Sequence, residues 1–81
     1  MNIVKIIKSD NEIKLSLYDD DTLNLLESES FADTSTINFY LQTLPRRHKI
    51  KKALLIVHDK NKNSVNMIIA EDENSFFIEE N

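Results

Sequence analysis

Apolar residues in this chain gather in short runs of strand length and in one helical stripe, and this pattern constrains the fold more than any other feature. Residues 3–8 form a run rich in β-branched residues, which ends at a turn-prone Ser-Asp-Asn sequence. Ile13, Leu15 and Leu17 then alternate with polar residues, which is the period of a half-buried strand. Together the two segments predict a hairpin.

A single stripe at helical spacing follows in the middle of the chain. It consists of Ile37, Tyr40, Leu41 and Leu44, at positions i, i+3, i+4 and i+7. Residues 33–35 (Asp-Thr-Ser) supply capping oxygens before it. Pro45 lacks the amide that a further turn needs, so we expect the helix to end there.

The segment 19–28 has two interpretations. Its three consecutive aspartates are suited to the start of a short helix, because carboxylates accept free amides and favour a helix N-terminus. They are equally suited to a turn into a third strand, in which Leu23 and Leu25 share a face. The shortness of the segment favours the strand, and the alternative stays open.

The second half of the chain predicts more strands. Residues 53–57 are a continuous apolar run, typical of a central strand covered on both faces. Residues 65–70 predict a further strand, and residues 75–78 a short last one. We therefore predict a single α+β domain over residues 1–81, with a mostly antiparallel sheet of five to six strands. Its order is meander, helix, meander, with one main helix packed on the sheet.

The absence of glycine and cysteine excludes several kinds of chemistry. Phosphate-binding loops, dinucleotide fingerprints and nucleophile elbows all need glycine, and thiol catalysis needs cysteine. His48 and His58 have no neighbouring ligands at metal-site spacing. Without glycine, Asn and Asp are expected in the tight turns. We expect no enzyme activity, no cofactor and no metal site.

Charge is sorted into blocks along the chain. Residues 15–45 hold six carboxylates and no Lys or Arg, and residues 63–81 hold five carboxylates and again no base. Between them lies a basic segment whose five cations are Arg46, Arg47, Lys49, Lys51 and Lys52. An ordinary solvated surface mixes signs more evenly. The blocks therefore favour a protein that binds through charge.

The main functional hypothesis is an acidic surface that docks on a basic site of a larger protein and excludes nucleic acid from it. The residues predicted for this surface are Glu27, Glu29, Glu71, Asp72, Glu73, Phe76, Phe77, Glu79 and Glu80. The two phenylalanines point to opposite faces of an extended segment, so one of them is expected to be an exposed anchor. Pairing of the last strand in a homodimer is an alternative.

The basic segment supports a second hypothesis, which is nucleic-acid binding through Arg46, Arg47, Lys49, Lys51 and Lys52. The acidic remainder of the chain and the lack of aromatic residues in this segment argue against it. A purely structural role is the third possibility. Cations after a helix C-terminus offset the helix dipole, and they can pair with the acidic block that precedes them.

In its size, acidity and lack of catalytic motifs the chain is similar to small phage-encoded anti-defence proteins, including anti-CRISPR inhibitors. The similarity is one of composition and covers no alignable motif. It implies a protein partner with a basic surface, such as a nuclease. The chain shows neither a signal peptide nor a run of about 20 apolar residues, so we expect a cytoplasmic protein that does not bind membranes.

Overall fold

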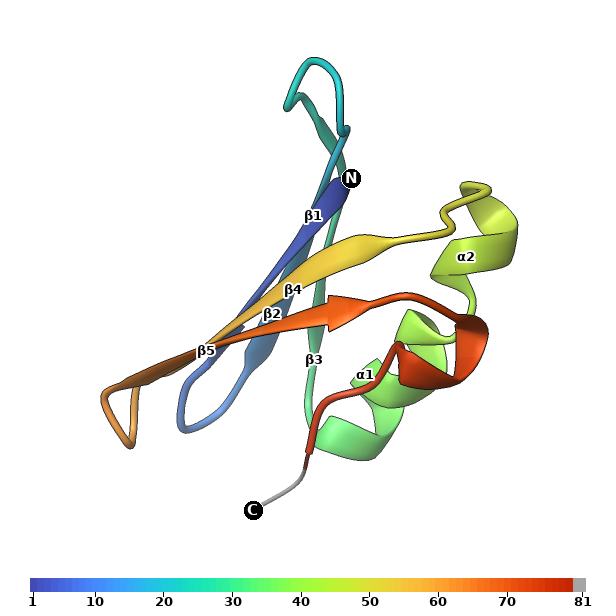
Figure 1. The fold of residues 1–81 in the computed structure, drawn as a ribbon. Coiled ribbons are helices and arrows are strands. Elements are labelled where there is room, and N and C mark those ends of the chain that lie inside the picture. Colours follow the sequence, from blue (N-terminus) through green and yellow to red (C-terminus); the bar gives the residue numbers. More distant parts are fainter. Residues whose placement is uncertain (80–81) are drawn as a thin grey trace.

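A computed structural model describes residues 1–79 of the chain (Figure 1). The elements in chain order are β1 (Asn2–Lys8), β2 (Ile13–Tyr18), β3 (Leu25–Phe31), α1 (Thr34–Leu41), α2 (Leu44–Arg47), β4 (Ala53–Asp59), β5 (Ser64–Ala70) and the 3-10 turn η1 (Glu73–Ser75). The five strands form one sheet, and the main helix packs on it. This arrangement confirms the predicted α+β class.

Strand order in the sheet is β3-β2-β1-β4-β5. The pairs β1–β2, β2–β3 and β4–β5 are antiparallel, as expected of two meanders. The join between the meanders is parallel, because β1 pairs with β4 in a register that places Asn2 beside Ala53. Strand β1 is therefore the central strand, while β3 and β5 form the two edges.

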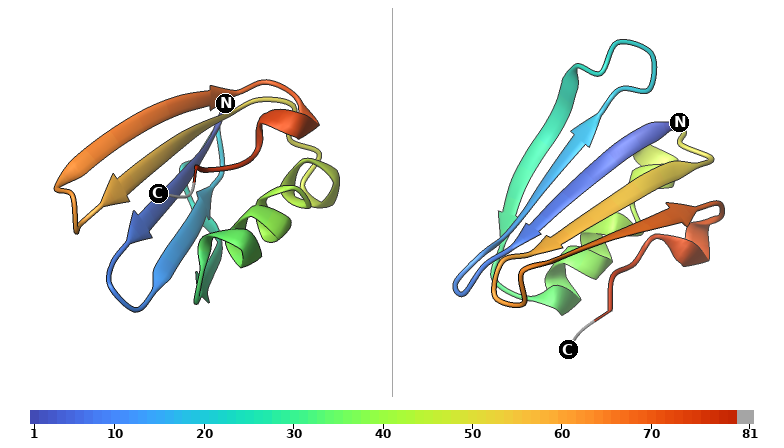
Figure 2. Two further views of the ribbon diagram at one scale, coloured as in Figure 1. Left: turned by 90° about the horizontal axis from the view of Figure 1, so that it is seen from below. Right: turned by 60° about the vertical axis from the view of Figure 1, so that its left-hand side comes forward.

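Strand alternation explains why one face of the sheet is buried. Along β2 the side chains of Ile13, Leu15 and Leu17 point to the helices and are at most 5% exposed. Val4 and Ile6 on β1 join them in the core. Both helices lie on this side of the sheet, and no helix covers the other side within residues 1–79 (Figure 2).

The helix begins where its cap was predicted. Asp33 is the N-cap, and its Oδ1 accepts hydrogen bonds from the Thr36 amide at 2.9 Å and the Thr36 hydroxyl at 2.7 Å. These bonds hold the pKa of Asp33 below its usual value. The predicted end of the helix at Pro45 is wrong. Helix α1 stops at Leu41, and Pro45 lies in the first turn of α2, where its missing amide has no partner to lose.

Two further expectations need correction. The segment 19–28 contains a turn followed by β3, so the strand alternative holds, but Leu23 lies before the strand and β3 runs from Leu25 to Phe31. The predicted last strand at residues 75–78 is absent. Instead, η1 is followed by an irregular segment whose Phe76 and Ile78 enter the core. None of the helices in residues 1–79 is long and apolar enough to cross a bilayer.

Among residues 1–79, three have left-handed backbone angles, namely Leu23 (φ 60°), Lys49 (φ 54°) and Asn63 (φ 50°). Asn63 fits the expectation that Asn or Asp would replace glycine in turns. Leu23 and Lys49 do not, because their side chains tolerate this region poorly. Lys49 lies between α2 and β4, in the middle of the basic segment.

Candidate protein-binding surfaces

The acidic and basic blocks meet between β3 and α2. The guanidinium of Arg47 donates two hydrogen bonds to the Glu27 carboxylate, from Nη1 at 2.6 Å and from Nη2 at 3.1 Å. Its Nε donates to the Thr43 hydroxyl at 3.0 Å, and the guanidinium lies 4.9 Å from the ring centroid of Tyr40. These contacts fix the planar group on both its edge and its face.

Electrostatic consequences of this pairing are mutual. The Arg47 hydrogen bonds lower the pKa of Glu27, and Glu27 raises the pKa of Arg47. The His48 Nε2 also contacts the Glu27 carboxylate, whose side chain is only 17% exposed. Glu27 and Arg47, predicted for two rival binding surfaces, are therefore joined to each other and hold β3 against α2.

A second link between the blocks joins Lys52 to Glu71, with 3.5 Å between Nζ and Oε1. Near it, a hollow of about 650 Å³ is lined by Lys49 and Lys51 on one side and by Glu71, Asp72 and Glu73 on the other. Part of the charge segregation seen along the chain is thus cancelled in space. The structural role that the sequence allowed, pairing with the preceding acidic block, is met by Arg47 and Glu27, and Lys52 adds a pair with the block that follows.

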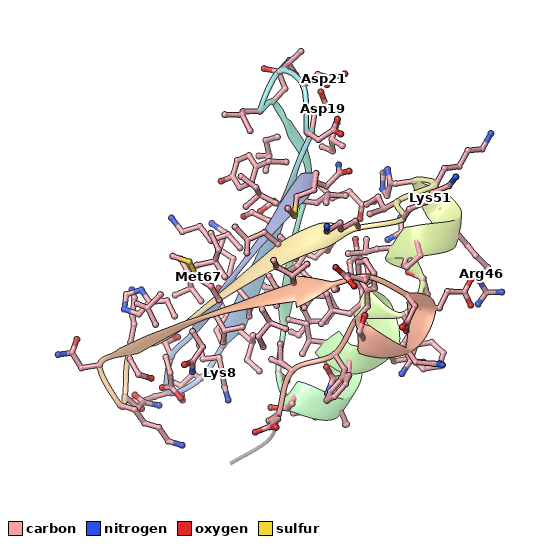
Figure 3. The ribbon with its side chains drawn as sticks, viewed as in Figure 1. Lys8, Asp19, Asp21, Arg46, Lys51 and Met67 are labelled. Carbon is pink, nitrogen blue, oxygen red and sulfur yellow. The ribbon has the colours of Figure 1, made fainter. Side chains whose placement is uncertain are left out.

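Within the basic segment, the cations without a carboxylate partner lie in α2 and in the loop that follows it. Arg46, Lys49 and Lys51 are exposed, and none has an ion pair within residues 1–79. Figure 3 shows Arg46 and Lys51 projecting outward at the α2 end of the molecule. Phosphate contacts from the basic segment would depend on these three residues, because Arg47 and Lys52 have carboxylate partners.

The C-terminal segment is held by one asparagine of α1. Asn38 Nδ2 donates to the Ile78 carbonyl at 2.9 Å, and Asn38 Oδ1 accepts from the Ile78 amide at 2.7 Å. Phe76 is 1% exposed and Ile78 3% exposed, whereas Phe77 between them is 47% exposed. The predicted anchor Phe76 is therefore a core residue, since an extended backbone that buries Phe76 and Ile78 must turn Phe77 outward.

Carboxylates flank Phe77 along this segment. Asp72 caps η1 through a 2.9 Å hydrogen bond from the Asn74 amide, while Glu73 and Glu79 are exposed. We call the exposed set the C-terminal acidic surface, and it comprises Glu71, Asp72, Glu73, Phe77 and Glu79. Glu80 lies outside the described residues. Glu27 and Glu29 belong to β3 at the far edge of the sheet, so the predicted acidic residues do not form one surface.

A half-open groove of about 560 Å³ runs between β5 and the C-terminal segment. Lys8 and Lys62 line it together with Asp59, Phe77 and Glu79, so its charges are mixed. Asp59 is engaged by the turn after β4, where its Oδ1 accepts from the amides of Asn61 at 3.0 Å and Lys62 at 3.3 Å. Ser64 and Ser75 line the groove, and no histidine does so within residues 1–79, so these hydroxyls have no imidazole base beside them there.

Asp19, Asp20 and Asp21 bring carboxylate oxygens within 4.8 Å of one another. The Asp19 carboxylate already accepts from the Thr22 amide at 3.0 Å and the Thr22 hydroxyl at 2.9 Å. These bonds lower its pKa and shape the turn before β3. The cluster is thus accounted for by turn formation, and we assign no cation site to it.

Sequence reasoning missed the uncovered face of the sheet. Strand β4 has the apolar run of a strand buried on both sides, yet Leu54 and Ile56 are only half-buried on the side without helices. On β5 the side chains of Val65, Met67 and Ile69 are at least 50% exposed. The continuous apolar run at residues 53–57 did indicate this face, because such a run is typical of a strand buried on both sides. Within residues 1–79, no helix or strand covers the second side.

Comparisons with protein families, with characterised proteins and with solved structures give no significant match.

Proposed function

We propose that this protein is a small cytoplasmic protein-binding module, an inhibitor that docks its C-terminal acidic surface on the basic nucleic-acid-binding site of a larger protein. The observation that carries the proposal is the exposure of Phe77 between two buried neighbours. An aromatic side chain that is already oriented loses little freedom on binding, and aromatic residues dominate the energetics of many interfaces.

Charge around Phe77 suggests the kind of partner. Glu73 and Glu79 are exposed on either side of it in the chain, and the whole chain has a net charge of −4. An anionic surface is attracted to the positive potential of a nucleic-acid channel and competes there with phosphate. An inhibitor of the anti-CRISPR kind would act in this way on a nuclease.

Fixation of the segment supports the same proposal. The two hydrogen bonds between Asn38 and Ile78 tie it to α1, and Ser75 Oγ accepts from the amides of Glu71 at 3.0 Å and Asp72 at 3.1 Å. A surface held in this way presents its carboxylates without a large ordering penalty.

The test uses the intact chain as bait in a bacterial lysate, followed by a DNA gel shift with each captured basic protein. The wild-type chain is expected to displace DNA from its partner. Phe77→Ser, or Glu73→Lys combined with Glu79→Lys, is expected to raise the concentration needed at least about tenfold. The matched control is Asp20→Lys with Asp21→Lys, which makes the same charge change in the exposed turn between β2 and β3, away from the C-terminal segment (Figure 3). An equal loss in this control, or no DNA-binding partner at all, contradicts the proposal.

The alternative, nucleic-acid binding by the basic segment, is separated by titrating labelled DNA and RNA with the chain itself at two salt concentrations. With Arg46, Lys49 and Lys51 as the exposed cations, log affinity would fall with log salt at a slope of about −2.7. Tight, salt-sensitive binding that is lost when these three residues are changed to Ala favours the alternative over the inhibitor.

A further inference from the structure

The side of the sheet without helices carries an apolar strip over three adjacent strands. The register aligns Ile3 on β1 with Leu54 on β4 and Ile69 on β5, and in the next row it aligns Ile56 with Met67. Met67 is 68% exposed and Ile69 50% exposed. Figure 3 shows Met67 pointing away from the helices. Val65 completes the set, which we call the open-face strip: Ile3, Leu54, Ile56, Val65, Met67 and Ile69.

Cations border this strip. Lys5 lies between Ile56 and Ser16 in the middle row of the sheet, and Lys14 pairs with Ile7 in the next row. The outward-pointing residues of the five strands include no carboxylate, although the chain has a net charge of −4. Glu12, in the turn before β2, brings one carboxylate to the β3 corner of this face, where it accepts a hydrogen bond at 3.1 Å from Ser30, the cross-strand neighbour of Lys14. The face is thus apolar and positive, and it favours an acidic occupant.

Two other occupants fit less well. Two copies packed face to face would bury Lys5 against surfaces of its own sign, because no strand residue on this face is a carboxylate and Glu12 lies away at the β3 corner. Single-stranded nucleic acid uses aromatic platforms, and among the outward positions of the strands only Tyr18 and the half-buried His58 carry a ring. The side chains of the strip are aliphatic, so they are better suited to packing against apolar side chains of a protein than to stacking on bases.

Dimensions indicate the shape of the occupant. The axes of β1 and β5, with β4 between them, are about 10 Å apart, because neighbouring strands lie about 4.8 Å apart. A helix with its side chains is about 10–12 Å wide. The other face of the same sheet is covered by helix α1, and a strand buried on both faces has the continuous apolar pattern of residues 53–57.

We propose that the open-face strip binds an amphipathic helix of a partner protein, with the apolar stripe of that helix on the strip and its flanking carboxylates beside Lys5 and Lys14. The site lies across the sheet from the C-terminal segment, whose Phe76 and Ile78 pack on the helix-covered face. It is a different surface from the one around Phe77, and the two meet at the β5 edge, where Met67 and Phe77 line the same groove.

The probes are two designed helical peptides of about 18 residues with the same leucine stripe, one flanked by Glu and the other by Lys. Amide chemical shifts of the isotope-labelled chain are followed by NMR as each peptide is added. The Glu peptide is expected to shift β1, β4 and β5 but not the exposed side of α1, and to bind about tenfold more tightly than the Lys peptide. Lys5→Glu with Lys14→Glu should abolish or reverse this preference.

Arg46→Glu with Lys51→Glu is the matched control, because it makes the same charge change at two exposed cations at the α2 end of the molecule (Figure 3). Met67→Ser should weaken the Glu peptide while leaving the circular dichroism spectrum unchanged, since this side chain is exposed. Failure of the Glu peptide to bind, equal affinity for both peptides, or shifts confined to the helical side overturns the proposal. So does a dimer in sedimentation that Met67→Asp dissociates, which would make a second copy the occupant.

Discussion

Glu27 and Arg47, twenty residues apart in the chain, form a two-pronged ion pair that joins an edge strand to the short helix α2. One residue comes from an anionic block and the other from the cationic segment, so charges that look like rival binding sites in the sequence hold the fold together. Because the acidic and basic blocks partly pair in the folded chain, the surface has a weaker electrostatic potential than the charge blocks in the sequence suggest. The surfaces that remain are Phe77 with its carboxylates and the open face of the sheet.

Replacing Glu27 tests the structural value of this pair. Glu27→Gln is expected to lower the free energy of unfolding by about 1 kcal/mol, because solvent screens a pair at the surface. Urea denaturation of this variant, of Arg47→Gln and of the double variant measures the coupling between them. Additive losses would show that the two side chains do not stabilise each other.

Acid stability should depend on the same carboxylate. Because the pKa of Glu27 is lower in the folded than in the unfolded chain, its contribution is fully present above the unfolded value. It is lost as pH falls from about 4.5 through the folded pKa. Stability against urea measured between pH 7 and pH 3 should therefore fall less steeply in Glu27→Gln than in the wild type. Parallel curves for the two proteins would contradict this assignment.

Asn38 is expected to control the C-terminal segment. Asn38→Ala removes both hydrogen bonds to Ile78 and should lower the free energy of unfolding by about 1–2 kcal/mol. Hydrogen exchange at the Ile78 amide should become faster than in the wild type, while exchange in β2 follows global stability alone. Gln42→Ala, an exposed position just after α1, is the control. Unchanged exchange at Ile78 would mean that Phe76 and Ile78 hold the segment without Asn38.

Capping of α1 by Asp33 gives a separate prediction. Asp33→Ala removes the acceptor for the Thr36 amide and should lower the melting temperature by about 5 °C. Asp10→Ala changes the same kind of residue in the exposed turn after β1 and should have little effect. A similar decrease in both variants would point to net charge rather than capping as the cause.

Lys49 is the position where glycine should help. Its φ of 54° lies in the region that a side chain disfavours, so Lys49→Gly is expected to raise the free energy of unfolding by about 0.5–1 kcal/mol. Lys49→Val should lower it, because a β-branched side chain tolerates this region least. The melting temperatures of the wild type, Lys49→Gly and Lys49→Val give the order of stability. A higher melting temperature for Lys49→Val than for Lys49→Gly would show that the backbone at this turn is not strained.

Much of the fold follows from local patterns that the sequence displays. The alternation in β2, the apolar run in β4 and the first three residues of the helical stripe, with the Asp33 cap, lie where their periodicity places them, whereas Leu44 begins α2. Strand pairing does not follow in the same way, because periodicity defines a strand's faces but not its neighbours. The parallel pair β1–β4 is therefore absent from the prediction.

The candidate surfaces were harder to predict for similar reasons. From the sequence, either Phe76 or Phe77 could be the buried one. The path of the backbone after η1 decides that Phe76 is buried and Phe77 is exposed. Glu27 pairs with Arg47 and Lys52 with Glu71, and both partners are distant in the sequence. A local spacing rule therefore does not predict these pairs. The open-face strip arises from the absence of a second helical layer, which is a property of topology and not of any one segment.

The parallel pairing of β1 with β4 also has a kinetic consequence. The hairpin β1–β2 and its extension to β3 need only short loops, whereas the central seam of the sheet must wait until residues about 50 positions apart have met. Closing so long a loop lowers the conformational entropy of the chain before the contacts between β1 and β4 can stabilise it. We expect docking of β4 on β1 to limit the folding rate, with both flanking hairpins forming and dissolving many times before the seam closes.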